Sequence, residues 1–177
     1  MKRLSAAPTE GLTYKPTEPK YWERSGLDAE IDRIFDICHG CRLCFNLCPS
    51  FPYLFDAVDG SEEEDVRALS QEQRDRVVDL CWGCKLCHIK CPYTPDDGHE
   101  FQLDFPRLML RAKAVRAREE GGVAWRERVL GDPEALGKAA GMSPGLANWA
   151  NRTRFHRVAM ERLLGVHRDK LLPDFAE

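Results

Sequence analysis

The amino-acid sequence predicts an all-α protein in which each of two cysteine-rich loops follows a helix. Residues 27–35 carry apolar side chains at the intervals of one helical face, directly before the first cysteine. A capping-box-like pattern over residues 25–28 precedes this face, and Ser70 and Gln73 form a capping box ahead of the second cysteine run. No convincing strand pattern is present. We therefore expect helices to position both loops.

Three further helices are expected beyond residue 100, each with a polar cap or a proline at its start. They run from Asp104 to Gly121, from Asp132 to Gly141 and from Ser143 to about Leu164. The last of them carries apolar and arginine side chains, including Trp149. Two interpretations stay open for it: its apolar side packs on the rest of the chain, or it docks a partner domain and Trp149 is exposed.

Composition excludes several classes of protein. The chain has 177 residues, a net charge of −3 and 31% charged residues, as is ordinary for a soluble globular protein. No apolar stretch is long enough for a membrane span, and no apolar segment follows the Met-Lys-Arg start as a secretory signal requires. Residues 1–100 carry 12 basic and 19 acidic side chains, and residues 101–177 carry 14 and 10. Charge therefore gives no support for nucleic-acid binding.

The eight cysteines form two runs that are offset by 43 residues. Both runs read C-x-G-C-(R/K)-L-C-x-x-x-C-P, and seven of the twelve positions are identical. An internal duplication is the simplest explanation, and it predicts that the two loops are related by a pseudo-two-fold axis. The cysteines of the two runs are Cys38, Cys41, Cys44 and Cys48, then Cys81, Cys84, Cys87 and Cys91.

The spacing of these cysteines is that of proteins with two iron–sulfur clusters. Three thiolates at two-residue spacing can wrap one cubane, whereas the fourth lies too far along the chain and reaches the other cluster. We therefore predict two [4Fe–4S] clusters with crossed ligands. One is held by Cys38, Cys41, Cys44 and Cys91, and the other by Cys81, Cys84, Cys87 and Cys48.

Other interpretations of the cysteines fit less well. A zinc site needs four ligands, often in two C-x2-C pairs, and does not use this triple spacing twice. Disulfides are rare in the reducing compartment that we expect for a chain without a signal peptide. No nucleotide-binding motif and no catalytic nucleophile system is evident, so no catalytic residue is predicted.

Some neighbours of the cysteines are also expected to act at the clusters. Gly40 and Gly83 lie between the first two ligands of each run, where the backbone must approach the inorganic sulfides closely. Leu43 and Leu86 are expected to cover the clusters against water. The histidines inside the loops, at 39 and 88, occupy different repeat positions and are expected beside the ligands or at the surface.

The duplicated motif, each copy preceded by a helix, resembles the α-helical ferredoxin domain rather than the βαββαβ ferredoxins, which have short strands there. Similar domains occur in one of the subunits of heterodisulfide reductase and in the iron–sulfur subunits of anaerobic glycerol-3-phosphate dehydrogenase, glycolate oxidase and lactate oxidation complexes. The resemblance covers residues 25–100. It implies a division into an extended arm (residues 1–24), a dicluster domain (25–100) and a helical extension or linker to a partner or downstream domain (101–177).

The resemblance implies an electron-transfer component of an oxidoreductase complex, with no substrate site of its own. Its partners would be a flavoprotein dehydrogenase and a quinone or a cysteine-rich reductase domain with a Cys-Cys-Gly signature. Such a chain is expected in the cytoplasm, with membrane association only through a partner. It could be a separate small subunit or the N-terminal part of a longer protein. The alternative function is a structural or redox-sensing iron–sulfur module that has no role in electron transfer.

Overall fold

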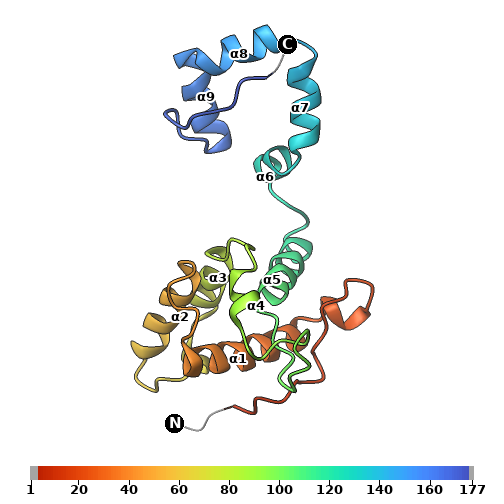
Figure 1. Cartoon of the computed structure of the whole chain (residues 1–177), viewed down its shortest axis with the longest axis vertical. Helices are drawn as coiled ribbons and strands as arrows, with labels where there is room; N and C mark the ends of the chain where they lie inside the picture. Colours follow the sequence, from red (N-terminus) through yellow and green to blue (C-terminus); the bar gives the residue numbers. More distant parts are fainter. Residues whose placement is uncertain (1–3, 176–177) are drawn as a thin grey trace. The chain divides into compact units, whose positions relative to one another are not determined.

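The computed structural model describes residues 4–175, so the ends of the expected arm and extension, residues 1–3 and 176–177, lie outside the described residues (Figure 1). All regular elements within the described range are helices, which confirms the all-α prediction. The chain divides into two compact units, the first ending at Glu119 and the second beginning at Glu120.

The first unit contains two 3₁₀ helices and five α-helices. These are η1 (Pro19–Trp22), α1 (Arg24–Cys41), α2 (Ser50–Asp59), η2 (Val66–Ala68), α3 (Gln71–Asp79), α4 (Leu86–Lys90) and α5 (Phe105–Glu119). The second unit contains four α-helices. These are α6 (Trp125–Leu130), α7 (Pro133–Gly141), α8 (Pro144–Arg152) and α9 (Arg154–Leu164).

The core of the first unit forms where the apolar faces of α1, α2, α3 and α5 meet. Aromatic rings from three of these helices lie at its centre, with 4.6 Å between the ring centroids of Phe51 and Phe105 and 6.2 Å between those of Phe35 and Phe105. Burial of such apolar side chains is the main stabilising contribution to a small helical domain. Cys81 and Cys87 are buried in the same cluster, so the core reaches the cysteine loops directly.

Local capping signals in the sequence are mostly confirmed. Ser70 and Gln73 form the predicted reciprocal capping box at the start of α3. Asp104 accepts from the backbone N–H of Arg107, and Asp132 caps α7. The expected cap at residues 25–28 is wrong, because α1 already begins at Arg24 and has Glu23 as an N-cap without a side-chain bond. Tertiary packing, rather than a side-chain cap, thus determines where α1 begins.

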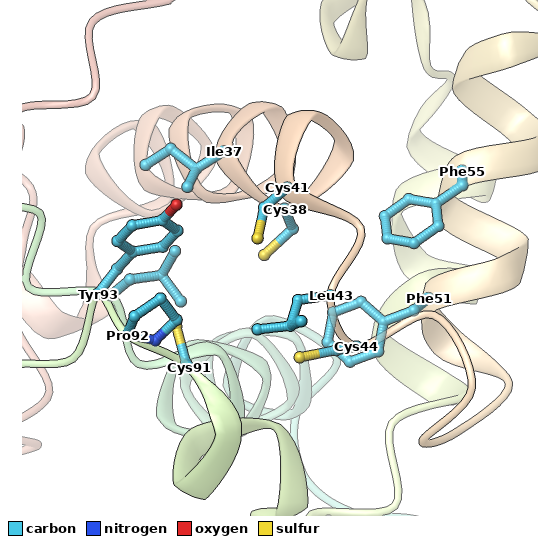
Figure 2. A pocket seen from close by; sticks show the side chains of 11 residues that line it. Ile37, Cys38, Cys41, Leu43, Cys44, Phe51, Phe55, Cys91, Pro92 and Tyr93 are labelled. Atoms are coloured by element: carbon cyan, nitrogen blue, oxygen red, sulfur yellow. The ribbon is translucent and has the colours of Figure 1, made fainter.

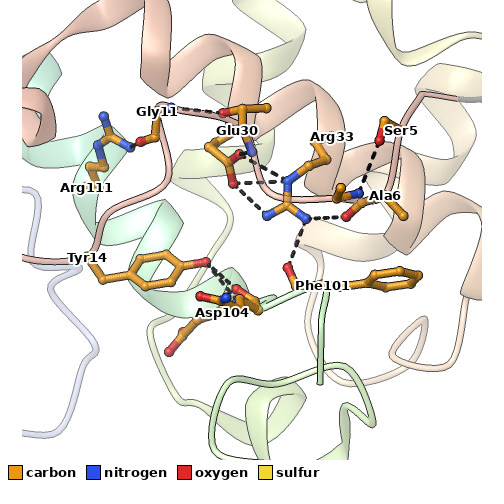
Figure 3. Close-up of polar contacts among 12 residues, drawn as sticks. Ser5, Ala6, Gly11, Tyr14, Glu30, Arg33, Phe101, Asp104 and Arg111 are labelled. Atoms are coloured by element: carbon orange, nitrogen blue, oxygen red, sulfur yellow. Dashed lines mark hydrogen bonds and ion pairs between the residues drawn. The ribbon is translucent and has the colours of Figure 1, made fainter. Parts of the chain in front are cut away.

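The N-terminal segment packs against the first unit along much of its length. Two buried arginines donate hydrogen bonds to its carbonyl groups: Arg33 to Ala6, and Arg111 to Gly11 and two further residues (Figure 3). A Cβ on Gly11 would lie only 2.4 Å from the carbonyl oxygen of Gly26, so this crossing requires glycine. The segment expected as an extended arm therefore lies within the first unit.

Helix α5 also belongs to the first unit, although the expected division placed it in the extension. Its residues Phe105, Leu108 and Met109 are buried in the core. The compact unit thus extends past residue 100 to Glu119, because α5 supplies one wall of the core. The structural division of the chain differs from the sequence-based one at both ends of the dicluster segment.

The helix expected from Ser143 to Leu164 is interrupted. Thr153 has an extended backbone conformation (ψ 124°) and separates α8 from α9, and its hydroxyl bonds the Trp149 carbonyl at 2.9 Å. None of the described hydrophobic residues of the second unit is buried. Trp149 is 64% exposed within the second unit. Packing on the first unit and docking of a partner domain both stay predictions for this helix.

Candidate metal centre

The first cysteine run begins on the last turns of α1, which carry Cys38 and Cys41. The helix ends when Arg42 adopts a left-handed conformation (φ 53°), and this reversal leads into the turn that carries Cys44. Arg42 and His39 both contact the Asp59 carboxylate at the end of α2, with 2.8 Å between His39 Nε2 and Asp59 Oδ1. The bond from Arg42, assisted by His39, lowers the pKa of Asp59 to about 2. The loop is thereby fixed to α2.

The helix before the second cysteine run ends at a different point from the helix before the first. Helix α3 ends at Asp79, before the first cysteine of the run, whereas α1 continues through two cysteines. Lys85, which occupies the repeat position of Arg42, is also left-handed (φ 61°) and precedes α4. Gly83 has a positive φ of 65°, which supports glycine between the first two ligands, whereas its counterpart Gly40 is an exposed helical residue. Both repeats therefore have a left-handed residue at the same position, but the backbone between their first two cysteines differs.

Four cysteines line one pocket of the first unit, and they come from three segments of the chain. They are Cys38, Cys41, Cys44 and Cys91. Figure 2 shows these residues around a shared space, with Cys91 facing the others from the second run. This set is the one that the spacing assigns to the first cluster. The thiols approach the space from different sides, as the ligands of one cubane must.

The other four cysteines influence one another electrostatically. Burial raises the pKa of Cys81, and the neighbouring Cys48 and Cys84 raise it further. Burial likewise raises the pKa of Cys87 to about 12, with contributions from the charges of cysteines in both runs, Cys48 among them. The fourth cysteine of the first run therefore lies near the second run. Cys44 Sγ is 4.0 Å from the Cys87 carbonyl oxygen, so the two sets of cysteines are in contact.

Thiols in the first set show the same effect. Burial raises the pKa of Cys38 well above its usual range and that of Cys44 to about 11, and other thiolates of the site, Cys91 first, add to both shifts. Crowded, partly desolvated thiolates repel one another, so Cys38 and Cys44 stay neutral when the site holds no cation. An iron–sulfur cluster would supply the positive iron that these sulfurs lack.

Loading of the clusters should therefore compete with protons. Because pKa values near 11 and 12 keep Cys44 and Cys87 protonated, each ligand must lose a proton to bind iron. We expect the apparent affinity for iron to rise steadily from pH 7 to pH 9 in competition with a chelator. A plateau below pH 8 would indicate preformed thiolates and contradict this prediction. Neutral Cys44 and Cys87 also contribute to the stability of the metal-free site, and this contribution is lost as pH rises from about 9 to about 12.

The accessory residues fall into two groups. Leu43 lines the pocket of the first set but remains half-exposed, and Leu86 is also half-exposed, so neither is a complete cover. Sequence reasoning missed Tyr93, which also lines this pocket and whose pKa is raised by the neighbouring charge of Cys41. It also missed Lys113 of α5, whose Nζ donates to the Cys81 carbonyl at 2.9 Å. No local motif marks these two residues, because both reach the cysteines through tertiary contacts.

The crossed ligand pattern is directly testable by substitution of one cysteine. We expect Cys48→Ser to perturb the cluster of Cys81, Cys84 and Cys87 and to leave the other nearly intact, because Cys48 lies beside the second run. Electron paramagnetic resonance of the reduced variant would resolve the two signals. Cys91→Ser is the matched control and should perturb the other cluster. Loss of the Cys38 cluster alone in Cys48→Ser would instead show local ligation.

In residues 4–175, no group of three His, Cys, Asp or Glu residues is arranged to hold a single metal ion. None of the helices in this range is long and apolar enough to span a bilayer.

Comparison with known proteins gives one match. A family model described as a 4Fe-4S dicluster domain matches residues 30–92. No curated protein and no solved structure is significantly similar to the chain. The matched segment contains all eight cysteines. The match supports an iron–sulfur domain of the ferredoxin type over residues 30–92, and its eight cysteines fit two [4Fe–4S] clusters.

Proposed function

We propose that this chain is an electron-transfer protein that passes single electrons through two neighbouring [4Fe–4S] clusters. The observation that carries the proposal is the contact between the two sets of cysteines, where Cys44 Sγ lies 4.0 Å from the Cys87 carbonyl oxygen. Two redox groups so placed would exchange electrons readily, whereas a purely structural role needs only one cluster. When bound, the clusters supply the one-electron chemistry, and the protein sets their potentials and their access to partners.

The crossed ligand sets define which residues would hold each cluster. Cys91 would complete the first cluster beside Cys38, Cys41 and Cys44, with which it shares a pocket. Cys48 would complete the second. Each cluster would then join the two sequence repeats, so neither could be lost without loosening the packing between α1 and the loop after α3. This coupling supports a rigid pair of redox centres.

The proposed partners are a flavoprotein dehydrogenase as electron donor and a quinone or a Cys-Cys-Gly reductase domain as acceptor. The resemblance of the duplicated motif to α-helical ferredoxin domains supports these classes. Trp82 and Ile89 add to this support, because both are exposed apolar residues of the second cysteine loop, where a redox partner would have to approach. The chain would then connect a flavin that releases single electrons to an acceptor.

The test combines composition with redox behaviour. Full-length protein prepared without oxygen should contain about eight iron atoms and eight acid-labile sulfides per chain, as two cubanes require. Redox titration should then give reversible one-electron couples, and a flavoprotein reductase supplied with NADPH should reduce them. Stoichiometric zinc without sulfide would contradict the proposal. Intact clusters that decompose instead of cycling would favour the structural or redox-sensing alternative.

A further inference from the structure

Tyr93 lies beside two cysteines of the same set. Together with Cys41 and Cys91 it lines the pocket of the first set, and Figure 2 shows its ring beside this space. The charge of Cys41 raises the pKa of the Tyr93 hydroxyl, as expected for neighbouring groups. We propose that this hydroxyl donates a hydrogen bond to a sulfur of the cluster held by the first set, and that it thereby raises the reduction potential of this cluster and leaves that of the other cluster unchanged. This inference rests on the binding of two clusters under the proposed function.

Neighbouring contacts hold the Tyr93 ring in place. Its centroid is 5.0 Å from that of His99 and 5.4 Å from that of Phe101, and these two rings pack against each other at 4.5 Å. The Tyr93 carbonyl accepts a 2.9 Å bond from the backbone N–H of Leu103, another residue of the pocket wall. The ring is thus held in place before any cluster binds, so a bond from its hydroxyl to sulfur would cost little ordering.

The first repeat, which supplies Cys48 to the other set, has no equivalent donor. Ser50 occupies the position that corresponds to Tyr93, two residues after the fourth cysteine of its run. Its hydroxyl is buried and donates instead to the Val77 carbonyl at 2.8 Å. The sequence duplication therefore conceals a chemical difference between the two sites. Hydrogen bonds to the sulfurs are among the factors that set the potential of an iron–sulfur cluster.

The direction of the effect follows from charge. Reduction adds one electron to the cluster, and part of the added negative charge lies on the cysteine sulfurs. A hydroxyl donor aimed at one of these sulfurs stabilises the reduced form more than the oxidised form. Removing the hydroxyl should therefore make reduction of this cluster less favourable. Two clusters with different potentials would give the added electron a preferred position within the chain.

The substitution Tyr93→Phe removes only the hydroxyl and keeps the ring that packs on His99 and Phe101. We expect potentiometric titration of the full-length, cluster-loaded chain to show one midpoint potential shifted to a more negative value and the other unchanged. Repeating the change in the Cys48→Ser background should shift the couple that this background leaves intact. Tyr14→Phe is the matched control, because the Tyr14 hydroxyl bonds the Gln102 carbonyl and the Asp104 N–H instead of a cysteine.

Equal shifts of both couples, no shift, or failure of Tyr93→Phe to load the first cluster would each overturn the inference. Resonance Raman spectra of the oxidised protein give a second measurement that needs no reversible couple. Loss of the hydrogen bond should shift an iron–cysteine stretching band in Tyr93→Phe but not in Tyr14→Phe, and an unchanged band would overturn the inference. Absence of reversible couples together with the Raman shift would reject the proposed function and retain the Tyr93 bond.

Discussion

Removing iron from the protein should unfold the first unit rather than merely bleach its colour. The cysteines join segments that are far apart in sequence, and Cys81 and Cys87 lie within the hydrophobic core. Binding free energy at a structural metal site is also folding free energy, on the order of 10 kcal/mol for structural zinc. The total stability of a domain is only about 5–15 kcal/mol. We therefore expect loss of the clusters to remove most of the stability of this unit.

Circular dichroism and thermal unfolding before and after oxidative removal of the clusters would measure the effect. Helical signal should fall, and the cooperative thermal transition of the first unit should disappear. Protein treated with chelator alone, with its clusters intact by absorbance, is the control for loosely bound metal. A cluster-free chain with the same helical signal and the same thermal midpoint would contradict the prediction.

Helices with local signals are predictable from the sequence. The caps at Ser70, Asp104 and Asp132 form as expected because each depends only on residues three positions away. Helix α2 is not among the expected helices, although residues 51–58 place apolar side chains at helical intervals. It has no side-chain cap, and so short an apolar run does not by itself distinguish a helix from other buried structure.

Long-range contacts explain why the unit boundaries are not predictable. Arg111 donates to carbonyls at Gly11, Lys20 and Tyr21, about 90–100 positions away in the sequence. The sequence does not indicate that an arginine on the polar face of a predicted helix will be buried. Its partners here are backbone carbonyl groups, which every residue type carries. These contacts bring the N-terminal segment and α5 into one unit with the cysteine loops.

The residues of the candidate site also fall into a group that the sequence predicts and a group that it does not. Its ligands follow from spacing, because the chemistry of a cubane constrains cysteines that are close in sequence. Residues that modify the ligands do not follow from spacing. Tyr93 reaches Cys41 only because the chain returns past α1 after the second run, and Lys113 reaches Cys81 from α5. A duplicated motif thus predicts where iron binds but not how the two sites differ.

The ion pair of Glu30 and Arg33 on α1 is the second feature with a large expected effect. Both side chains are almost completely buried, at 0% and 2% exposure, and Arg33 Nη2 lies 2.6 Å from Glu30 Oε2. Arg33 also donates 2.9 Å bonds to the carbonyls of Ala6 and Phe101, as Figure 3 shows. One side chain therefore connects α1, the N-terminal segment and the segment that follows the second cysteine run.

Arg33→Met should destabilise the cluster-loaded protein by about 3–5 kcal/mol, the usual cost of leaving one charge of a buried pair without its partner. Glu30 would keep only the 2.8 Å bond from the Thr9 N–H, which is too little for a buried carboxylate. Urea unfolding under argon would measure the loss. Adding Glu30→Gln to Arg33→Met should recover part of it, since the unpaired charge is then removed. Arg24→Met is the control: Arg24 and its partner Glu119 are both partly exposed, so its loss should cost at most about 1 kcal/mol. An equally small loss in Arg33→Met would show that the buried pair does not hold the N-terminal segment in place.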